Sequence, residues 1–375
     1  MKIKLFSLLL TISLSACTTI EIKKLDKETD MISNNDAKKI VIAHRGASGY
    51  LPEHSLASKA MAHAMDVDYI EQDVVMTKDD QIIVLHDPYL DRVTNVMSVF
   101  PERSRNVFGE KRWLAIDFTL DEIKQLKMTE GFSLDSNSHQ KTQNYPNRFP
   151  MFKSNFQVVT LAEEIELIQG LNATTGKNIG IYVEIKSPWF HQLEGKDISR
   201  KTLQLIKQYG YQTKSDKVYI QCFDPDETKR INDQLMPELD MDLKLVQLIA
   251  ETEWKETMRM ENGKLVNYKY DWMFEEGAMD RISRYADGIG PWMPMLVSNE
   301  STPDNIIDTG MLKKAHDKGL TVHPYTFRKE KNKMPPYAKD FNHLLEIFLY
   351  QIGVDGLFTD FPDLAVKYIE QKSKD

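Results

Sequence analysis

Beyond about residue 38, the chain alternates between short runs rich in Val, Ile and Leu and longer stretches of helical character. The apolar runs predict eight strands: Ile40–Ala43, Tyr69–Met76, Ile179–Ile185, Val218–Phe223, Leu243–Ile249, Asp287–Gly290, Leu320–Pro324 and Val354–Thr359. Strands that are mostly apolar on both faces are typical of a parallel sheet covered by helices. Eight strand–helix units in about 340 residues favour an α/β fold of the TIM (β/α)8 barrel type. A doubly wound open sheet is the alternative.

The predicted helices begin at residues that can cap them. Thr160 precedes Glu163 by three residues, and Thr119 precedes Glu122 by the same spacing, which is that of a capping box. Asp224, followed directly by a proline and two acidic residues, has the chemistry of another helix start. These signals place helices between the strands.

One connection is too long for an ordinary loop. The stretch from about residue 88 to residue 157 separates the second predicted strand and its hairpin from the next helix. Connections in compact domains are usually about 4–6 residues long. We therefore expect a small insertion after the second strand, beside the barrel.

Composition narrows the function classes. Of the 375 residues, 48 are Lys or Arg and 56 are Asp or Glu, which gives a formal net charge of -8. Proteins that hold long nucleic acids by neutralising phosphates normally carry a basic excess, so no nucleic acid partner is expected. The 2 cysteines exclude a disulfide scaffold and a Cys-rich zinc site. The sequence leaves the oligomeric state open.

The N-terminus has the pattern of an export signal. Lys2 and Lys4 precede a short apolar run that is well below the roughly 20 residues of a membrane-spanning helix. The run ends in Leu14-Ser15-Ala16-Cys17, which resembles the bacterial lipoprotein signal, in which the cysteine is lipidated. The alternative is a secretory signal with an incidental cysteine. Thr18 after the cysteine resembles an outer-membrane address.

This resemblance divides the chain into three parts. Residues 1–16 would be the lipoprotein signal peptide, and residues 17–38, which are polar and lack periodicity, a flexible tether. Residues 39–375 would form the barrel domain. The protein would then be exported and lipid-anchored in the bacterial envelope through Cys17, at the outer membrane facing the periplasm or the cell surface.

Polar side chains interrupt the apolar strands at their ends. The first strand runs into His44-Arg45, at the rim where barrel enzymes place their chemistry. In the second strand, Glu71 and Asp73 share a face because side chains alternate along a strand. Such carboxylates repel each other unless a cation lies between them, and a hard divalent ion would use oxygen ligands of this kind. The alternative is a solvent-facing strand edge.

Two further elements are candidates for the same rim. A two-residue hairpin turn at Asp79-Asp80 would set His86 opposite Asp73, whereas a slip of one residue would turn His86 away. Glu184 and Lys186 share a face of the third strand, giving another oxygen donor and a cation that could hold a phosphate. An ordinary salt-bridged strand end is the alternative for this pair.

Taken in order, these elements resemble the glycerophosphodiester phosphodiesterase family. The matching segments are His44-Arg45-Gly46, Glu71-x-Asp73, His86-Asp87, Glu184-x-Lys186 and Phe358-Thr359-Asp360-Phe361-Pro362-Asp363. The likeness spans nearly the whole mature chain and is greatest to the exported bacterial branch. It implies a TIM barrel with a small insertion, one divalent cation, and two histidines acting as acid and base.

The resemblance also assigns roles. It implies that the metal ligands are Glu71, Asp73 and Glu184. The catalytic histidines would be His44 and His86, and the residues that bind phosphate would be Arg45 and Lys186. It favours Ca²⁺, with Mg²⁺ as the other possibility. Three positions depart from the family pattern: His54 stands where many members have Asn, Pro88 where the exported branch has His, and Val183 where it has Pro.

The predicted reaction is hydrolysis of small glycerophosphodiesters such as glycerophosphocholine to an alcohol and sn-glycerol 3-phosphate. A phospholipase-D-like enzyme acting on intact lipids would need an apolar entrance, whereas the predicted insertion is charged around Pro101–Arg112. A surface lipoprotein that binds a host or envelope partner is an alternative of another class. Such a binder would have no need of both histidines and all three carboxylates.

Overall fold

A computed structural model describes residues 38–135 and 140–374 of the chain. The predicted signal peptide, Cys17 and nearly all of the predicted tether lie outside the described residues. None of the helices in the described ranges has the length and apolar character needed to cross a membrane.

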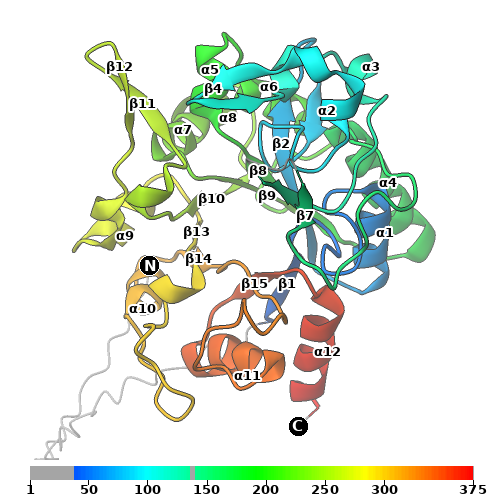
Figure 1. The fold of residues 1–375 in the computed structure, drawn as a ribbon. Coiled ribbons are helices and arrows are strands. Elements are labelled where there is room, and N and C mark those ends of the chain that lie inside the picture. Colours follow the sequence, from blue (N-terminus) through cyan, green and yellow to red (C-terminus); the bar gives the residue numbers. More distant parts are fainter. Residues whose placement is uncertain (1–37, 136–139, 375) are drawn as a thin grey trace, which may run out of the picture. The chain divides into compact units, whose positions relative to one another are not determined.

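The described residues form a parallel β-barrel (Figure 1). Its strands are β1 (Ile40–Ala43), β2 (Tyr69–Met76), β8 (Gly180–Ile185), β9 (Val218–Cys222), β10 (Lys244–Leu248), β13 (Gly288–Gly290), β14 (Thr321–Val322) and β15 (Gly356–Thr359). The order around the sheet is β14-β13-β10-β9-β8-β2-β1-β15. The two end strands are linked because Asp355 N donates to Val322 O at 3.2 Å and Phe358 N to Pro324 O at 3.0 Å. The predicted TIM barrel is confirmed, and the open-sheet alternative is wrong.

Helices follow the strands in the order that the sequence predicts. They are α1 (Leu56–Ala64), α4 (Leu161–Thr175), α5 (Pro188–Leu193), α6 (Ile198–Gln208), α7 (Pro225–Arg230), η4 (Ile231–Leu235), α8 (Met236–Glu238), α9 (Ala278–Ile282), α10 (Met311–His316), α11 (Phe341–Glu346), η8 (Ile347–Ile352) and α12 (Pro362–Lys372). Single turns form at η5 (Thr252–Trp254), η6 (Asp271–Phe274) and η7 (Met293–Met295). The capping boxes at Thr119 and Thr160 are present, and Asp224 caps α7.

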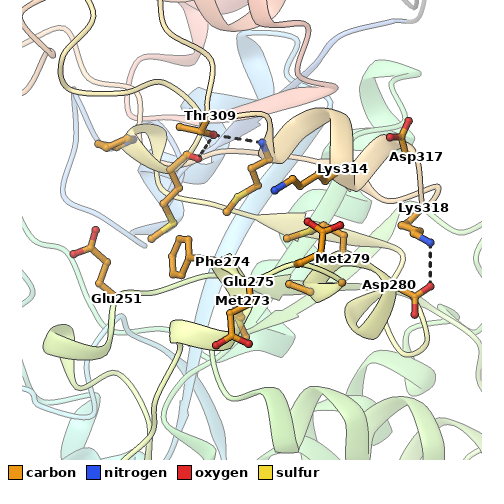
Figure 2. A pocket seen from close by; sticks show the side chains of 16 residues that line it. Glu251, Met273, Phe274, Glu275, Met279, Asp280, Thr309, Lys314, Asp317 and Lys318 are labelled. Carbon is orange, nitrogen blue, oxygen red and sulfur yellow. Dashed lines mark hydrogen bonds and ion pairs between the residues drawn. The ribbon is translucent and has the colours of Figure 1, made fainter.

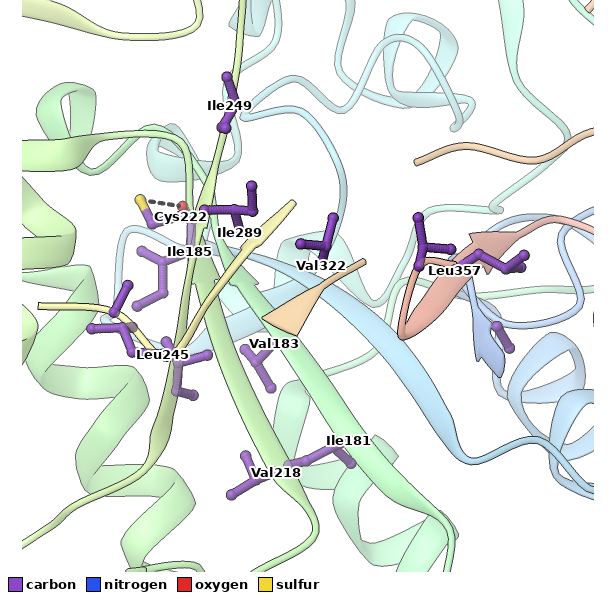
Figure 3. Close-up of a cluster of buried hydrophobic side chains, with 14 of the residues drawn as sticks. Ile181, Val183, Ile185, Val218, Cys222, Leu245, Ile249, Ile289, Val322 and Leu357 are labelled. Carbon is purple, nitrogen blue, oxygen red and sulfur yellow. Dashed lines mark hydrogen bonds between the residues drawn. The ribbon is translucent and has the colours of Figure 1, made fainter. Parts of the chain in front are cut away.

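Strand alternation divides the apolar side chains between two layers. Ile181, Val183 and Ile185 of β8 belong to the large cluster between the barrel and its helices (Figure 3). Tyr182, on the opposite face of the same strand, stacks on Tyr219 with ring centroids 4.7 Å apart. The barrel interior is therefore filled by a cluster in which Tyr69, Tyr182, Tyr219 and Phe358 pack with Ile42 and Val246.

The hairpin after β2 differs from its predicted register. β3 (Ile82–Val84) pairs with β2 through Val74↔Val84 and Met76↔Ile82, one residue away from the predicted pairing. The predicted two-residue turn at Asp79-Asp80 is wrong because Thr77 organises a longer loop, its Oγ1 accepting from Gln81 N at 3.0 Å. The ladder ends at Leu85, whose N donates to Asp73 O at 2.9 Å. His86 lies beyond it, so strand alternation does not direct this side chain away from the rim.

The insertion follows β3 rather than β2. It contains α2 (Val96–Val99), η2 (Pro101–Arg103), β4 (Arg105–Val107), β5 (Glu110–Arg112), η3 (Ala115–Asp117), α3 (Leu120–Ile123), β6 (Phe132–Leu134) and β7 (Lys141–Gln143). Trp113, Phe118 and Leu126 lie in an apolar cluster that also takes in Ile83 of β3. The insertion therefore has a core of its own that is anchored on the hairpin.

A second excursion from the barrel was not predicted. β11 (Met258–Glu261) and β12 (Lys264–Asn267) form an antiparallel hairpin after β10. Its turn is Asn262-Gly263, where both residues have positive φ, 51° and 75°. An Asn-Gly pair between alternating polar and apolar residues is the strongest short-range signal for a hairpin. The signal was present in the sequence.

Candidate active site

The carboxyl ends of the barrel strands surround a cavity of about 380 Å³. We call it the aromatic cavity; its lining is His44, Arg45, Glu71, His86, Glu184, Lys186, Gln221, Phe223, Leu248, Trp254, Glu256, Trp292, Tyr325, Thr326, Arg328 and Phe358. Six of the seven predicted catalytic, metal-binding and phosphate-binding residues line it. The seventh, Asp73, lies within 4 Å of Lys186 and Arg45. The structure therefore brings all seven together, while Cys17 lies outside the described residues.

A larger cavity of about 650 Å³ opens elsewhere, between α9 and α10 (Figure 2). Volume alone would favour it as a binding site. Its wall is built largely from methionines, Phe274 and surface charges such as the Asp280–Lys318 ion pair, and its lining residues include no histidine. The chemistry therefore selects the smaller, aromatic cavity.

His44 is oriented by Asp360, which follows β15. The ring Nδ1 lies 2.6 Å from Asp360 Oδ1, and the other oxygen of Asp360 accepts from Arg148 at 2.6 Å and from Arg328 at 2.7 Å. Burial raises the pKa of Asp360, but these cationic partners outweigh it and hold the pKa well below its usual range. The ionised carboxylate accepts from Nδ1–H, so the His44 Nε2 lone pair is left for a ligand. Burial, reinforced by Arg45, lowers the pKa of His44 to about 4.

His86 has the same arrangement. Its Nδ1 lies 2.6 Å from Asp87 Oδ1, and Arg92 pairs with the other carboxylate oxygen. Lys186 Nζ donates to His86 Nε2 at 3.4 Å, so this nitrogen also carries a lone pair. Burial, followed by the charges of Arg45 and Lys186, lowers the pKa of His86. The cavity thus has two neutral imidazoles, each with an accepting Nε2 and an aspartate behind it.

The strand register brings the acidic residues together. Asp73 of β2 stands opposite Glu184 of β8, and Glu71 lies two residues earlier on the same face of β2. Lys186 Nζ lies 2.6 Å from Glu184 Oε1 and 3.8 Å from Asp73 Oδ1. All three carboxylates are buried. A parallel ladder keeps neighbouring side chains in rows, so this proximity follows directly from the pairing of β2 with β8.

This acidic group fits a hard divalent cation. Burial and then the charge of Asp73 raise the pKa of Glu71, and burial raises the pKa of Glu184 to about 8 even though Lys186 opposes the shift. Asp73 Oδ1 is buried and, among the described residues, accepts no hydrogen bond. Oxygen donors that cannot all be ionised without a positive charge between them are the ligands that Ca²⁺ and Mg²⁺ prefer.

A second donor set overlaps the first. His54, Glu71 and Asp73 each offer one ligand atom, and these atoms lie within 4.8 Å of one another. His54 Nε2 is 2.8 Å from Asp73 Oδ2, while Lys59 Nζ lies 3.2 Å from His54 Nδ1. An ammonium group only donates, so Nδ1 must carry the lone pair and Nε2 the proton.

The protonation of His54 decides between the two donor sets. An Nε2–H that donates to Asp73 leaves no lone pair there for a metal. Burial, reinforced by Lys59, lowers the pKa of His54 to about 3, so the ring is neutral. His54 therefore positions Asp73 rather than offering a lone pair to a cation, which leaves carboxylate oxygens such as those of Glu71 and Asp73 as the donors at this place.

The buried ion pair behind His54 fixes this arrangement. Lys59 of α1 lies 3.2 Å from Glu164 of α4 and also donates to the carbonyl of Glu71. Both side chains are fully buried. Because an unpaired buried charge is costly, the ammonium of Lys59 is retained at this position only with these acceptors around it. Side chains from α1 and α4 thus meet behind β2, and Lys59 of α1 contacts that strand directly.

Arg45 turns the chain at the rim. Its φ is 57°, and the following Gly46 has φ 85°. A Cβ on Gly46 would lie 2.3 Å from Ser58 Oγ, so only glycine fits there. In this conformation the Arg45 amide donates to Glu71, and its guanidinium donates to Glu53 at 2.8 Å. The Arg45 side chain lines the same cavity as both histidines.

Several residues of the site were not assigned a role from the sequence. Asp360 was noted as part of a motif, His54 only as a departure, and Lys59 not at all. Trp254 and Glu256, which enter the aromatic cavity after β10, were also missed. The Ser55 start of α1 puts Lys59 one turn inside that helix, but nothing in the sequence says that it points through to His54. Side chains that come from separate elements and meet only in the folded chain leave no local pattern in the sequence.

Comparison with known proteins gives a consistent family. The model of the glycerophosphoryl diester phosphodiesterase family matches residues 44–364. A glycerophosphodiester phosphodiesterase of Haemophilus influenzae is 49% identical over 364 residues, which cover 96% of this chain and 98% of that protein. A glycerophosphodiester phosphodiesterase of Treponema pallidum is 42% identical over 346 residues, covering 92% and 95%.

Solved structures share the fold at lower identity. A phosphodiesterase of Oleispira antarctica, in complex with its product sn-glycerol-3-phosphate, has a TM-score of 0.55 at 19% identity and covers 89% of this chain and 97% of that one. A putative glycerophosphoryl diester phosphodiesterase of Silicibacter pomeroyi has a TM-score of 0.60 at 21% identity, covering 90% and 95%. These likenesses concern the barrel alone.

The hydrogen bond from His54 to Asp73 gives a prediction for cation binding. His54→Leu removes the donor, so the dissociation constant for Ca²⁺ should rise about tenfold, as is typical when a residue that orients a ligand is lost. His54→Asn keeps an N–H donor and should retain most of the affinity. Isothermal titration calorimetry measures both, with Glu184→Gln as the comparison.

The two donor sets predict opposite orders of effect. If Glu184 is a ligand and His54 is not, Glu184→Gln weakens Ca²⁺ binding more than His54→Asn does. A greater loss in His54→Asn than in Glu184→Gln would make the ring a ligand and contradict the deduced tautomer. Circular dichroism of each variant separates loss of affinity from loss of fold.

Proposed function

Because the chain belongs to the glycerophosphoryl diester phosphodiesterase family, we propose that it hydrolyses small glycerophosphodiesters such as glycerophosphocholine. The products are an alcohol and sn-glycerol 3-phosphate. His44 and His86 act as the acid–base pair, and Arg45 and Lys186 bind phosphate oxygens. One divalent cation is held by Glu71, Asp73 and Glu184, with Ca²⁺ favoured over Mg²⁺.

One observation carries the proposal. Two histidines line one cavity with Arg45 beside them, and each has a carboxylate 2.6 Å from Nδ1. Hydrolysis of a phosphodiester needs a proton taken from the attacking oxygen and a proton given to the departing alcohol. Two oriented imidazoles, each with a lone pair on Nε2, are suited to these roles, because imidazole titrates near neutral pH.

The surroundings of the rings set their protonation through the reaction. Burial keeps both imidazoles neutral before the substrate binds, which suits the ring that removes a proton. A bound phosphodiester brings a negative charge close to both rings and raises their pKa values. The ring beside the leaving oxygen can then carry the proton that the alcohol takes. Asp360 and Asp87 stabilise whichever ring is protonated.

The cationic side chains of the cavity can neutralise the negative charge of the substrate. A phosphodiester anion repels nucleophiles, and its transition state concentrates charge on the phosphate oxygens. Arg45 and Lys186 lie beside the histidines and donate hydrogen bonds from fixed positions. When bound, the divalent cation supplies further charge neutralisation at a phosphate oxygen. Glu71, Asp73 and Glu184 would keep it at the rim of the barrel.

Release of sn-glycerol 3-phosphate from glycerophosphocholine tests the proposal. The native protein should release it, EDTA should abolish the reaction, and added Ca²⁺ should restore it better than Mg²⁺. His44→Ala and His86→Ala should each lower kcat by about 10²–10⁴-fold, the usual contribution of acid–base groups. Activity that survives EDTA would remove the cation from the proposal.

Asp360 should matter through His44 rather than through the substrate. Asp360→Asn keeps the shape but can present an N–H to Nδ1, which would favour the tautomer with the proton on Nε2. We expect kcat to fall by at least about 10²-fold, with KM changing much less. Steady-state kinetics measure the split. Asp363→Asn, on the same segment but contacting Tyr50, is the matched control and should retain activity.

We also propose that the protein is exported and anchored through lipid on Cys17, with the outer membrane as its location. The support is the sequence pattern that ends at Cys17. Labelled palmitate should enter the native protein in cells and should not enter Cys17→Ser. The variant should leave the membrane fraction while keeping its phosphodiesterase activity. Labelling of Cys17→Ser equal to that of the native protein would contradict this anchor.

A further inference from the structure

A second cavity meets the aromatic cavity at the two histidines. It has a volume of about 440 Å³ and shares His44, Arg45, His86 and Arg328 with the first. We call it the cationic cavity; the rest of its lining is Ser48, Glu53, Asp87, Arg92, Asn144, Tyr145, Arg148, Lys333 and Asp360. A phosphodiester bound between the histidines would have one cavity on each side.

The two cavities differ in charge. The aromatic cavity has three cationic and three acidic side chains in its lining, besides its aromatic walls. The cationic cavity has five cationic against three acidic side chains, an excess of two. Its five are Arg45, Arg92, Arg148, Arg328 and Lys333.

The three carboxylates of the cationic cavity are already engaged. Glu53 pairs with Arg45 and Arg92, Asp87 pairs with His86 and Arg92, and Asp360 accepts from His44, Arg148 and Arg328. They therefore neutralise the arginines at the base of the cavity. Lys333 pairs with none of the three carboxylates, so part of the positive charge is left over.

The ring of Tyr145 packs against three cationic side chains of this cavity. The guanidinium carbons of Arg148 and Arg328 lie 3.7 and 5.9 Å from the centroid of this ring, and Lys333 Nζ lies 5.6 Å from it. Among the described residues, Lys333 Nζ and the two Nη atoms of Arg328 donate no hydrogen bond to an acceptor. These donors are held in place by an aromatic ring and are free to bind a ligand.

The wall that carries Tyr145 comes from outside the barrel. Tyr145 and Arg148 follow β7 in the insertion, while Arg328 and Lys333 follow β14. Arg148 Nε joins the two segments through Glu330 at 2.7 Å. The cationic cavity is therefore formed where the insertion meets the rim of the barrel.

We propose that the cationic cavity binds an anionic group, a carboxylate or a second phosphate, on the alcohol part of the phosphodiester. This inference rests on the proposed function. In the aromatic cavity, Arg45 and Lys186 are already assigned to the scissile phosphate, and the aromatic walls suit the carbons of the glycerol part. The anionic group of the alcohol part then lies near Lys333 and Arg328, from which it accepts charge-assisted hydrogen bonds.

Two substrates that differ by one carboxylate test the proposal. Glycerophosphoserine and glycerophosphoethanolamine share all other groups, so the ratio of their kcat/KM values isolates the carboxylate. At low ionic strength the native protein should favour glycerophosphoserine by about tenfold, mainly through KM, since one hydrogen bond between charged groups is of this size. The preference should shrink with added salt.

Variants locate the recognition. Lys333→Met and Tyr145→Leu should reduce that ratio, because the first removes a donor and the second the ring on which the cations pack. Lys331→Met is the matched control: it removes the same charge from the same loop but does not line the cavity, and it should leave the ratio intact. An alcohol part carrying a phosphomonoester, compared with its dephosphorylated form, distinguishes phosphate from carboxylate as the preferred group.

Three outcomes would overturn the inference. The native protein could cleave both members of each substrate pair equally well. Alternatively, Lys333→Met could lower kcat/KM for both substrates by the same factor, which would assign the lysine to the scissile phosphate. If no glycerophosphodiester releases sn-glycerol 3-phosphate at all, the proposed function fails, and this inference fails with it.

Discussion

The site depends on one electrostatic constraint: three carboxylates share a buried row at the end of the barrel. The pairing of β2 with β8 sets Asp73 opposite Glu184, and alternation along β2 adds Glu71 to the same face. Carboxylates in such a place cannot all be ionised unless positive charge lies between them. Lys186, Arg45 and Lys59 each bring part of that charge from a different element. A divalent cation would complete the balance.

Other charged side chains of the site contact the histidines rather than the carboxylate row. Asp360 and Asp87 do not reach the reacting atoms; they fix the tautomers of His44 and His86 and are themselves held by arginines. Lys59 does the same for His54 one layer deeper. Each histidine is thus oriented by a charged partner. The side chains of the proposed site therefore need little rearrangement during a reaction.

Sequence reasoning predicted the barrel well because the barrel has a local signal. The barrel strands are rich in apolar residues, and parallel pairing buries both of their faces. The polar residues at strand ends could be picked out for the same reason, since they interrupt those runs. The hairpin register failed by one residue because Thr77 stabilises a longer loop, and His86 still reaches the rim only because the ladder ends before it. Lys59 meets His54, and Asp360 meets His44, only through tertiary structure, which no local spacing in the sequence records.

The barrel and the insertion hold their side chains in different ways. The residues proposed to be catalytic sit at strand ends, where β-pairing fixes their positions and leaves little freedom to change them. Tyr145 and Arg148 instead come from a segment with its own apolar core at Trp113 and Phe118, joined to the rim by ion pairs. Substituting Tyr145 would change the proposed alcohol site without touching the carboxylate row, whereas Arg148 holds the carboxylate of Asp360 behind His44. On the proposed function, selectivity can therefore be changed apart from chemistry at Tyr145 but not at Arg148, whose partner Asp360 orients His44.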